Sequence, residues 1–392
     1  MTGALLSIFL SSCGNPPSNS TNINFPYGMA VCSTKTCNVF PGYTEGTSSS
    51  FAAVTSYGTH QVLIFNTYPA SFLVSNYSAS PPTSLSNSLQ GPDGLLISSE
   101  GFPGCTAPVL YAADGIDNKI GIWCNFNPAD TSNPAPTITI TGGGLQSPEG
   151  MALDWVNSSG TTLTAPILFV ANPGASNLLA FDLSQVTGPG SYNLSPSGGL
   201  ISGTAGGLPF GMPANNTSLN GPAFLAFSNS ANTLFLSNTG NSEVMVYGNA
   251  YCLGVARETG KGCSTNNQNI QPSVRLTGLN TFLSSPDGIA YHNGSLYVAD
   301  SGANSVLIWD GVLNGGFTGG NTPPTRRING SNTNQNGPYA LAIDNNPNSP
   351  PGNVFYVSQI NNGQIFGYNQ ASTVSGNIAP TFRINVTNPG LF

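Results

Sequence analysis

The sequence predicts an all-β protein, a six-bladed β-propeller of four-stranded antiparallel blades. A phrase that opens with Pro-x-Gly and an apolar run returns six times along the 392 residues. Each copy continues with a second apolar run, a turn rich in Asn and Gly, and a third run that usually ends in an aromatic residue. Repeats of tens of residues, each built from short strands, are typical of radially repeated β-sheets.

The six copies open at six prolines, which are Pro26, Pro92, Pro148, Pro222, Pro286 and Pro338. First strands are expected at 28–31, 94–97, 150–153, 224–227, 288–291 and 340–343. Second strands are expected at 51–54, 109–112, 167–170, 233–236, 296–299 and 354–357, and third strands at 62–65, 120–123, 178–181, 244–247, 306–309 and 364–368. These runs are short, rich in aromatic residues and bounded by Gly, Asn and Pro, which is the signature of strands.

A fourth strand is recognisable in four copies, at 135–140, 271–276, 324–328 and 379–384. Each of these runs carries a proline near its start. A missing N–H donor costs least on an edge strand, so these segments are predicted to be the outermost strands of their blades.

The combination of Pro-x-Gly-h-Ala-h, h-Tyr-Val-Ala-Asp and h-x-h-Trp/Phe, where h is an apolar residue, resembles the NHL-repeat propellers over residues 25–392. The copy at 285–309 carries these motifs most clearly. The resemblance implies a closed ring of six blades. Two copies depart from it, because Phe224 and Ala340 stand where the motif has glycine.

The N-terminus predicts export. Residues 1–12 contain an apolar stretch of the length of a signal-peptide core, although Met1-Thr2-Gly3 carries no basic residue. Leu10-Ser11-Ser12-Cys13 resembles a bacterial lipobox, which implies a lipid on Cys13 and a membrane anchor, with 13–24 as a flexible tether. The expected location is outside the cytoplasm, as a lipoprotein of the outer membrane or cell surface. Plain secretion, or neither, is the alternative.

Cysteine usage agrees with export. Of seven cysteines, removal of Cys13 leaves six, which pair by proximity as Cys32–Cys37, Cys105–Cys124 and Cys252–Cys263. Short disulfide loops indicate an oxidising compartment. The chain has no Cys-x-x-Cys and only two histidines, so zinc or haem is not expected.

Charged residues make up only 6% of the chain, and its net charge is −7. With eight Lys and Arg in total, a nucleic-acid surface is excluded as a partner. Few ionisable groups also mean little charge build-up when carboxylates are protonated in acid.

The candidate site lies at the mouth of the central channel, where the middle residues of the Pro-x-Gly turns should meet. These are Tyr27, Asp93, Glu149, Ala223, Asp287 and Tyr339. Asp93, Glu149 and Asp287 are candidate ligands of a hard cation such as calcium, and Tyr27 and Tyr339 are candidate binding residues. In that case calcium raises the melting temperature, and Glu149→Gln removes the rise. The alternative is that these side chains point into solvent.

A second set of side chains follows the second strands, namely Asp114, Asn172, Asn238 and Asp300. Asx side chains bond to the backbone of their own turns, so a structural role is expected for them.

The sequence favours a binding scaffold for a protein or glycan partner, with variable loops on a rigid ring and no assigned catalytic residue. One alternative is a divalent-metal hydrolase, similar to the gluconolactonase-type propellers, with calcium as the one cofactor to be considered. A carbohydrate-binding or adhesion module is the second alternative. The fold itself does not decide between them.

Mass spectrometry of non-reduced peptides tests the cysteine assignment. Bridged cysteines need Cα atoms within roughly 7 Å of each other, and the predicted fold brings three pairs near each other. We therefore expect the disulfides Cys32–Cys37, Cys105–Cys124 and Cys252–Cys263. Cys13 should be in none of them. A peptide that links Cys13 to another cysteine would contradict both the pairing and the lipid anchor.

Overall fold

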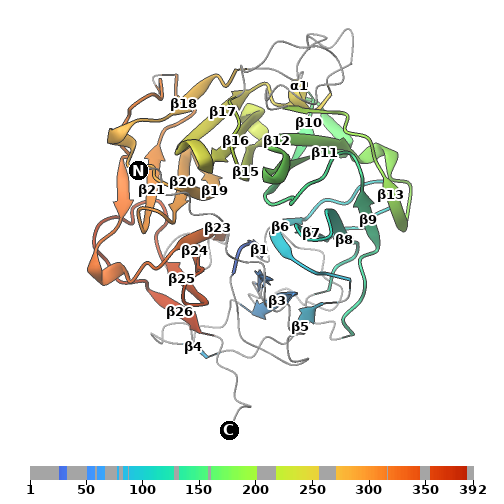
Figure 1. The fold of residues 1–392 in the computed structure, drawn as a ribbon, viewed down its shortest axis with the longest axis horizontal. Coiled ribbons are helices and arrows are strands. Elements are labelled where there is room, and N and C mark those ends of the chain that lie inside the picture. Colours follow the sequence, from blue (N-terminus) through green and yellow to red (C-terminus); the bar gives the residue numbers. More distant parts are fainter. Residues whose placement is uncertain are drawn as a thin grey trace, which may run out of the picture.

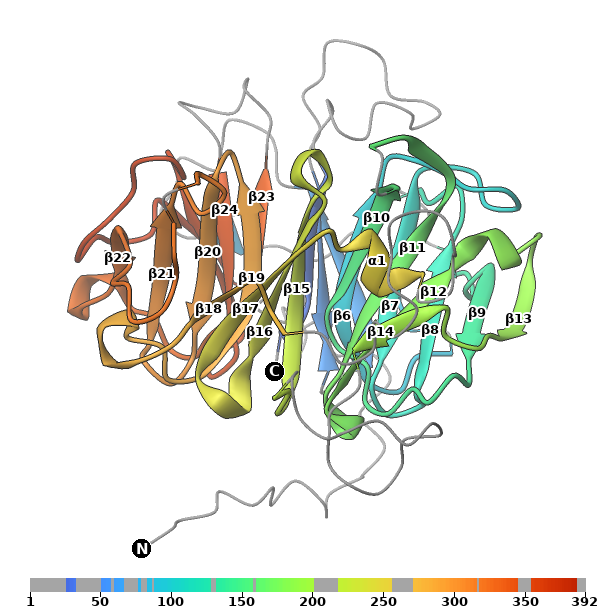
Figure 2. The same ribbon diagram turned by 90° about the horizontal axis from the view of Figure 1, so that it is seen from above.

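The computed structural model is a closed ring of six β-sheets, as the sequence predicts (Figure 1). It describes residues 26–32, 51–57, 60–66, 77–78, 83–86, 88–127, 132–157, 160–200, 218–255, 271–315, 317–344 and 354–385. The inner strand of each blade contacts the inner strand of the next, and the sixth contacts the first. The turned view in Figure 2 shows the blades side by side, with their strands running between the two faces of the ring.

Each blade has four antiparallel strands, given from the axis outward. Blade 1 is β1 (Met29–Cys32), β2 (Phe51–Ser56), β3 (Gln61–Asn66) and β5 (Thr83–Leu85); blade 2 is β6 (Pro92–Ser98), β7 (Val109–Asp114), β8 (Lys119–Trp123) and β9 (Ile138–Thr141). Blade 3 is β10 (Met151–Val156), β11 (Thr162–Asn172), β12 (Asn177–Asp182) and β14 (Gly198–Leu200); blade 4 is β15 (Pro222–Ser228), β16 (Thr233–Asn238), β17 (Glu243–Gly248) and β18 (Val274–Leu276). Blade 5 is β19 (Pro286–His292), β20 (Ser295–Asp300), β21 (Ser305–Asp310) and β22 (Arg326–Ile328); blade 6 is β23 (Pro338–Asp344), β24 (Val354–Gln359), β25 (Gln364–Tyr368) and β26 (Phe382–Asn385).

The remaining elements are short. Two further strands, β4 (Tyr77–Ser78) and β13 (Gly190–Asn193), join the outer edges of blades 6 and 2. The helices are η3 (Pro173–Ala175), η4 (Leu183–Gln185), η5 (Asn229–Ala231), η6 (Thr239–Asn241), α1 (Tyr251–Gly254), η8 (Leu279–Thr281) and η9 (Ser331–Thr333). No helix in the described part of the chain is long and apolar enough to cross a bilayer.

The predicted strands are confirmed, with one correction at the outer edge. The outer strands of blades 2, 4, 5 and 6 begin two residues after the prolines that were expected to start them, which are Pro136, Pro272, Pro324 and Pro380. Proline has no N–H to donate to the ladder, so pairing starts only beyond it.

The core lies between blades. Successive residues of a strand point to opposite faces, and the second strands are buried on both faces. In β7, Leu110 packs toward blade 1 and Tyr111 toward blade 3. The same alternation gives six apolar clusters, one at each interface, including the one that joins blade 6 to blade 1 through Tyr356 and Val54.

Close backbone contacts explain the motif glycines. A Cβ added to Gly94 would lie 2.0 Å from the carbonyl oxygen of Glu149 in the next blade, and one added to Gly288 would lie 2.1 Å from that of Tyr339. Gly28 and Gly150 face the carbonyl oxygens of Asp93 and Ala223 in the same way. Glycine is therefore required at these four of the six contacts between inner strands.

The outer edge of each blade is covered by the segment between the third and fourth strands of the next blade. β13 of blade 3 pairs in parallel with β9 of blade 2, and β4 of blade 1 pairs in parallel with β26 of blade 6. Single parallel bridges join Leu276 to Gly320 and Ile328 to Gly376. This covering leaves few free strand edges for association with other chains.

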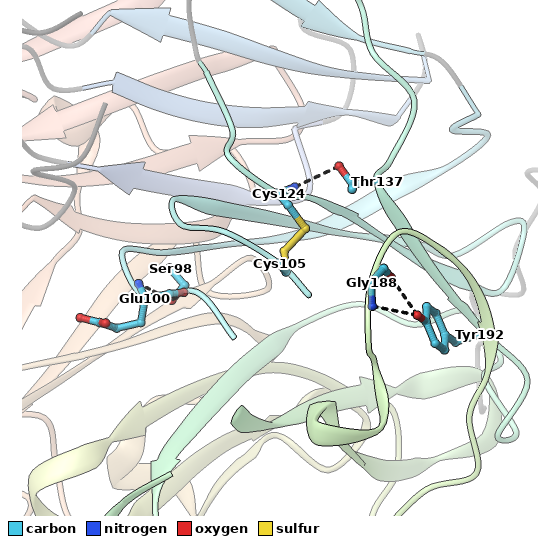
Figure 3. Close-up of a disulfide and its surroundings, with 7 residues drawn as sticks. All are labelled: Ser98, Glu100, Cys105, Cys124, Thr137, Gly188 and Tyr192. Atoms are coloured by element: carbon cyan, nitrogen blue, oxygen red, sulfur yellow. Dashed lines mark hydrogen bonds between the residues drawn. A yellow bond between two sulfur atoms is a disulfide. The ribbon is translucent and has the colours of Figure 1, made fainter. Parts of the chain in front are cut away.

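The disulfide Cys105–Cys124 is confirmed, with its Cα atoms 5.1 Å apart (Figure 3). It ties the loop before β7 to the end of β8, and the Cys124 N–H donates to the Thr137 hydroxyl. Cys252 in α1 is also disulfide-bonded. Cys13, Cys37 and Cys263 lie outside the described residues, as do the predicted signal peptide and tether at 1–24.

The inner-strand contact predicts a steep cost for Gly94→Ala. The added methyl group would overlap the Glu149 carbonyl, and such overpacking costs about 1–3 kcal/mol. Gly188→Ala is the control, because its added carbon would have no neighbour within 4 Å. Urea unfolding should show the loss for the first variant alone. Equal stability of the two variants would contradict the tight contact.

Candidate functional site

The loops that build the candidate site lie on the face of the ring where the inner strands begin, here called the Pro-x-Gly face. The buried carboxylate of Asp114 accepts hydrogen bonds from the N–H groups of Gln90 and Gly91 at 2.9 Å, just before the proline of the same blade. Asp300 accepts from Ser284 and Ser285 in the same way. Asn172 and Asn238 accept from Gln146 and Asn220.

These contacts confirm the structural role of the Asx set and extend it. Asp114 and Asp300 also accept from N–H groups three residues on, at Asp117 and Ala303, so they do cap their own turns. The longer-range bonds to the chain ahead of each proline were not predicted. They hold the Pro-x-Gly turn against the turn between the second and third strands, so both lie on one face.

Neighbouring blades are joined on this face by residues with a left-handed backbone. Asn118 (φ 53°) accepts from the Ser147 N–H in the next blade, and Asn304 (φ 45°) accepts from the Gly337 N–H. His60 occupies the equivalent turn of blade 1 and bonds to the Gln90 carbonyl. His60 thus serves the turn, while His292 ends β19 on the opposite face.

Six side chains converge where the inner strands begin, and we call them the mouth cluster: Tyr27, Asp93, Glu149, Ala223, Asp287 and Tyr339. Asp93 is only 8% exposed and Asp287 only 4%. Glu149, Tyr27 and Tyr339 are partly buried. The alternative that these residues simply point into solvent is therefore wrong for the two aspartates.

The two aspartates have different surroundings. The Asp93 carboxylate lies directly over Gly115, where a Cβ would come within 2.2 Å of its Oδ2. The Asp287 carboxylate accepts a hydrogen bond from Ser301, the residue equivalent to Gly115. The other oxygen of Asp287, Oδ2, is buried without any hydrogen-bond partner. A buried polar atom without a partner carries a free-energy cost.

Burial and mutual repulsion make these carboxyls weak acids. Burial raises the pKa of Asp287 to about 7, against the hydrogen bonds from Ser301. Burial, followed by the charges of Asp93 and Asp287, holds the pKa of Glu149 well above its usual range. Burial and the charge of Asp114 do the same to the pKa of Asp93. Around neutral pH the cluster therefore holds protons that ordinary carboxyls would have lost.

An aromatic row completes the mouth. Tyr27 makes edge-to-face contacts with Tyr57 and Tyr339, with ring centroids 5.1 and 4.9 Å apart. Tyr339 reaches Phe224 of blade 4, with centroids 5.5 Å apart. Burial and then the charge of Asp93 raise the pKa of Tyr27 to about 12.

Tyr57 and Phe224 were not predicted as site residues. In the sequence, Phe224 stands out only because it replaces the motif glycine. Since that glycine position lies at the axis, the replacement could have indicated that Phe224 belongs to the site. At this position the hydroxyl of Ser237 accepts the Phe224 N–H at 2.8 Å, and in blade 6 Ser358 accepts the Ala340 N–H at 2.9 Å. In blade 1 the Thr55 hydroxyl accepts the Gly28 N–H in the same way, so this contact occurs with and without the glycine.

The calcium site stays a prediction. Among the residues that the structure describes, no group of three or more His, Cys, Asp or Glu side chains is placed to hold a metal ion. Asp93, Glu149 and Asp287 do share one surrounding, because the charges of both aspartates act on Glu149. The three carboxyls are therefore near enough for their charges to affect one another, but they do not form a coordination shell.

No family model and no curated protein matches the sequence. Solved structures match it in fold. A humanized mutant of the Chaetomium thermophilum Polycomb Repressive Complex 2, bound to the inhibitor GSK126, is similar with a TM-score of 0.51 and 8% identity, over 90% of this chain and 68% of that chain. Virginiamycin B lyase from Staphylococcus aureus gives 0.45 and 11%, over 92% and 85%. A nidogen/laminin complex gives 0.41 and 13%, over 74% and 78%. At such identities the similarity concerns the fold alone.

The buried carboxyls predict that stability falls as the pH rises. The folded pKa of Asp287 lies above its unfolded value of 3.8, so the folded state binds the proton more tightly. Its contribution is complete below the unfolded pKa and is lost as the pH rises toward 7. Asp287→Asn should therefore gain stability over the natural protein between pH 4 and pH 8, by on the order of a few kcal/mol.

Urea unfolding at these two pH values measures the gain. Asp117→Asn is the matched control and should gain no stability, because this carboxylate is 37% exposed and pairs with Lys119. If the advantage of Asp287→Asn is the same at both pH values, the pKa of this carboxyl is not raised in the folded protein.

Proposed function

We propose that this protein is a binding scaffold whose Pro-x-Gly face receives the partner, a protein or a glycan. The observation that carries the proposal is the distribution of exposed apolar side chains. Among the described residues the large exposed ones are Ile116, Leu279 and Phe282, with exposed fractions of 48%, 93% and 45%. Ile116 lies in the turn between β7 and β8, and the other two lie between β18 and β19. Strand alternation puts both segments on the Pro-x-Gly face.

The three residues lie in different parts of the ring, but on the same face, where a partner that covers this face would contact all of them. Phe282 also has the Arg327 guanidinium 3.9 Å above its ring, so this part of the face presents a flat cation–aromatic surface. The loops that carry these residues are fixed by the Asx bonds described above. A rigid ring with a pre-ordered face loses little entropy on binding, which favours a binding role.

The proposal includes export. The lipobox-like Cys13 would anchor the ring to a membrane through the 13–24 tether, at the outer membrane or cell surface. The disulfide Cys105–Cys124 supports this, because disulfides persist in oxidising compartments. A resemblance to NHL-repeat propellers, on the motifs of the sequence, fits the same role.

The alternative is a metal-dependent hydrolase with calcium held by Asp93, Glu149 and Asp287. A binding scaffold should show the same melting temperature with and without millimolar calcium, and no lactone hydrolysis above background. The hydrolase should show a rise in melting temperature, following the logarithm of calcium over its dissociation constant, together with turnover.

Glu149→Gln separates the two functions, because it removes a charge but keeps the shape of the side chain. Loss of a calcium-dependent rise and of turnover in this variant, with both intact in Asp117→Asn, would overturn the scaffold. An unchanged melting temperature and no turnover in the natural protein, Glu149→Gln and Asp117→Asn would rule out the hydrolase.

A further inference from the structure

The three carboxyls of the mouth cluster have no cationic partner in the described part of the chain. The ion pairs there join Lys119 to Asp114 and Asp117, Arg275 to Glu243, and Arg326 to Asp310. Asp287 Oδ2 is left without a partner although the residue is only 4% exposed. The charges of Asp287 and Asp93 raise the pKa values of Glu149, Tyr27 and Tyr339, so these two carboxyls lie close to the rest of the cluster.

The other side of the cluster is aromatic. Around the axis the six positions follow the blade order, so Tyr339 and Tyr27 are neighbours in blades 6 and 1. The acidic residues occupy blades 2, 3 and 5. Edge-to-face contacts join Tyr57, Tyr27, Tyr339 and Phe224 into one aromatic row beside the carboxyls. Ring faces attract cations because of the aromatic quadrupole.

We propose that the mouth cluster binds an organic ammonium group, held by the carboxylates of Asp93, Glu149 and Asp287 and by the rings of Tyr27 and Tyr339. The inference rests on the proposed binding function and names the chemistry of its central contact. The group can belong to a free small amine or to a lysine side chain of a protein partner. Both present the same charged alkylammonium head.

An organic cation fits this arrangement better than a metal ion does. Calcium takes six to eight oxygen ligands at about 2.3–2.6 Å, which demands an assembled shell. The described residues offer no such group of three acidic or imidazole side chains. An alkylammonium head is larger and is held by charge and by ring faces at longer distances, so carboxyls and tyrosine rings can hold it without an assembled coordination shell.

Binding is expected to compete with protons. The groups that face the site are Asp93, Glu149, Asp287, Tyr27 and Tyr339, with Asp114 behind Asp93 and Asp300 behind Asp287. Raised pKa values mean that a cation meets partly protonated carboxyls at neutral pH, so binding expels protons. Affinity should therefore rise from pH 5 to pH 8, and heat measured in buffers of different ionisation enthalpy should report proton release.

Isothermal titration of the purified chain with tetramethylammonium chloride and with butylammonium chloride tests the proposal, with sodium chloride as the ionic-strength control. We expect saturable binding of at least one amine, weakened about tenfold or more by Asp287→Asn and by Tyr339→Leu. Asp117→Asn, on the same face but outside the mouth cluster, should bind as the natural protein does. If Tyr339→Leu does not fold, Asp287→Asn alone tests the site. This variant should fold, because it removes a buried charge that destabilises the folded state.

Further experiments distinguish a protein lysine from a free amine as the ligand, and the ammonium site from the scaffold function. A lysine-containing peptide that binds while its acetyl-lysine form does not, identifies a protein partner; binding of the free amines alone identifies a small ligand. No saturable binding of any probe, or equal binding by Asp287→Asn, overturns the ammonium site but leaves the scaffold standing. Calcium binding with lactone turnover overturns both.

Discussion

The contact on which this structure depends is the one between neighbouring inner strands at the axis. In four of the six blades a glycine lies against the carbonyl of the middle residue of the next blade, with no room for a side chain between them. This approach sets how tightly the ring closes. Because the middle residues then share a small space, their side chains are buried together whatever their chemistry. Ring closure buries Asp93 and Asp287, and the turns of their own blades add to the raised pKa values through the charges of Asp114 and Asp300.

This dependence explains what could be predicted from the sequence and what could not. The Pro-x-Gly phrase, the apolar runs and the Asn–Gly turns act over a few residues, so the blades, their order and the positions of Asp93, Glu149 and Asp287 were predictable. The pairing Cys105–Cys124 followed from the hairpin between β7 and β8. The roles of Tyr57 and Phe224 depend on contacts between blades distant in the sequence, and no local pattern encodes them. The parallel pairing of β4 with β26 joins residues from opposite ends of the chain and was equally hidden.

The mouth cluster places unusual chemistry in a chain that otherwise avoids charge. Only 15 of 392 residues are Asp or Glu, and three of them stand at equivalent positions around one axis. Their like charges repel, and burial removes the water that would otherwise solvate them. Each therefore makes the folded state less stable when ionised. Binding of a cation by these carboxylates would offset the repulsion and stabilise the folded state. The neighbouring tyrosine rings are suited to the same ligand.

Ring closure also bears on how the propeller can be held at a membrane. The four strands of blade 6, β23 to β26, all come from the end of the chain, and β4 pairs only along its outer edge. The first and last blades are joined instead by their shared apolar cluster, by the hydrogen bond from the Ser358 hydroxyl to the Pro26 carbonyl, and by β4 against β26. The described chain enters the ring at Pro26, so the tether proposed at 13–24 would reach the ring at this junction between blades 6 and 1.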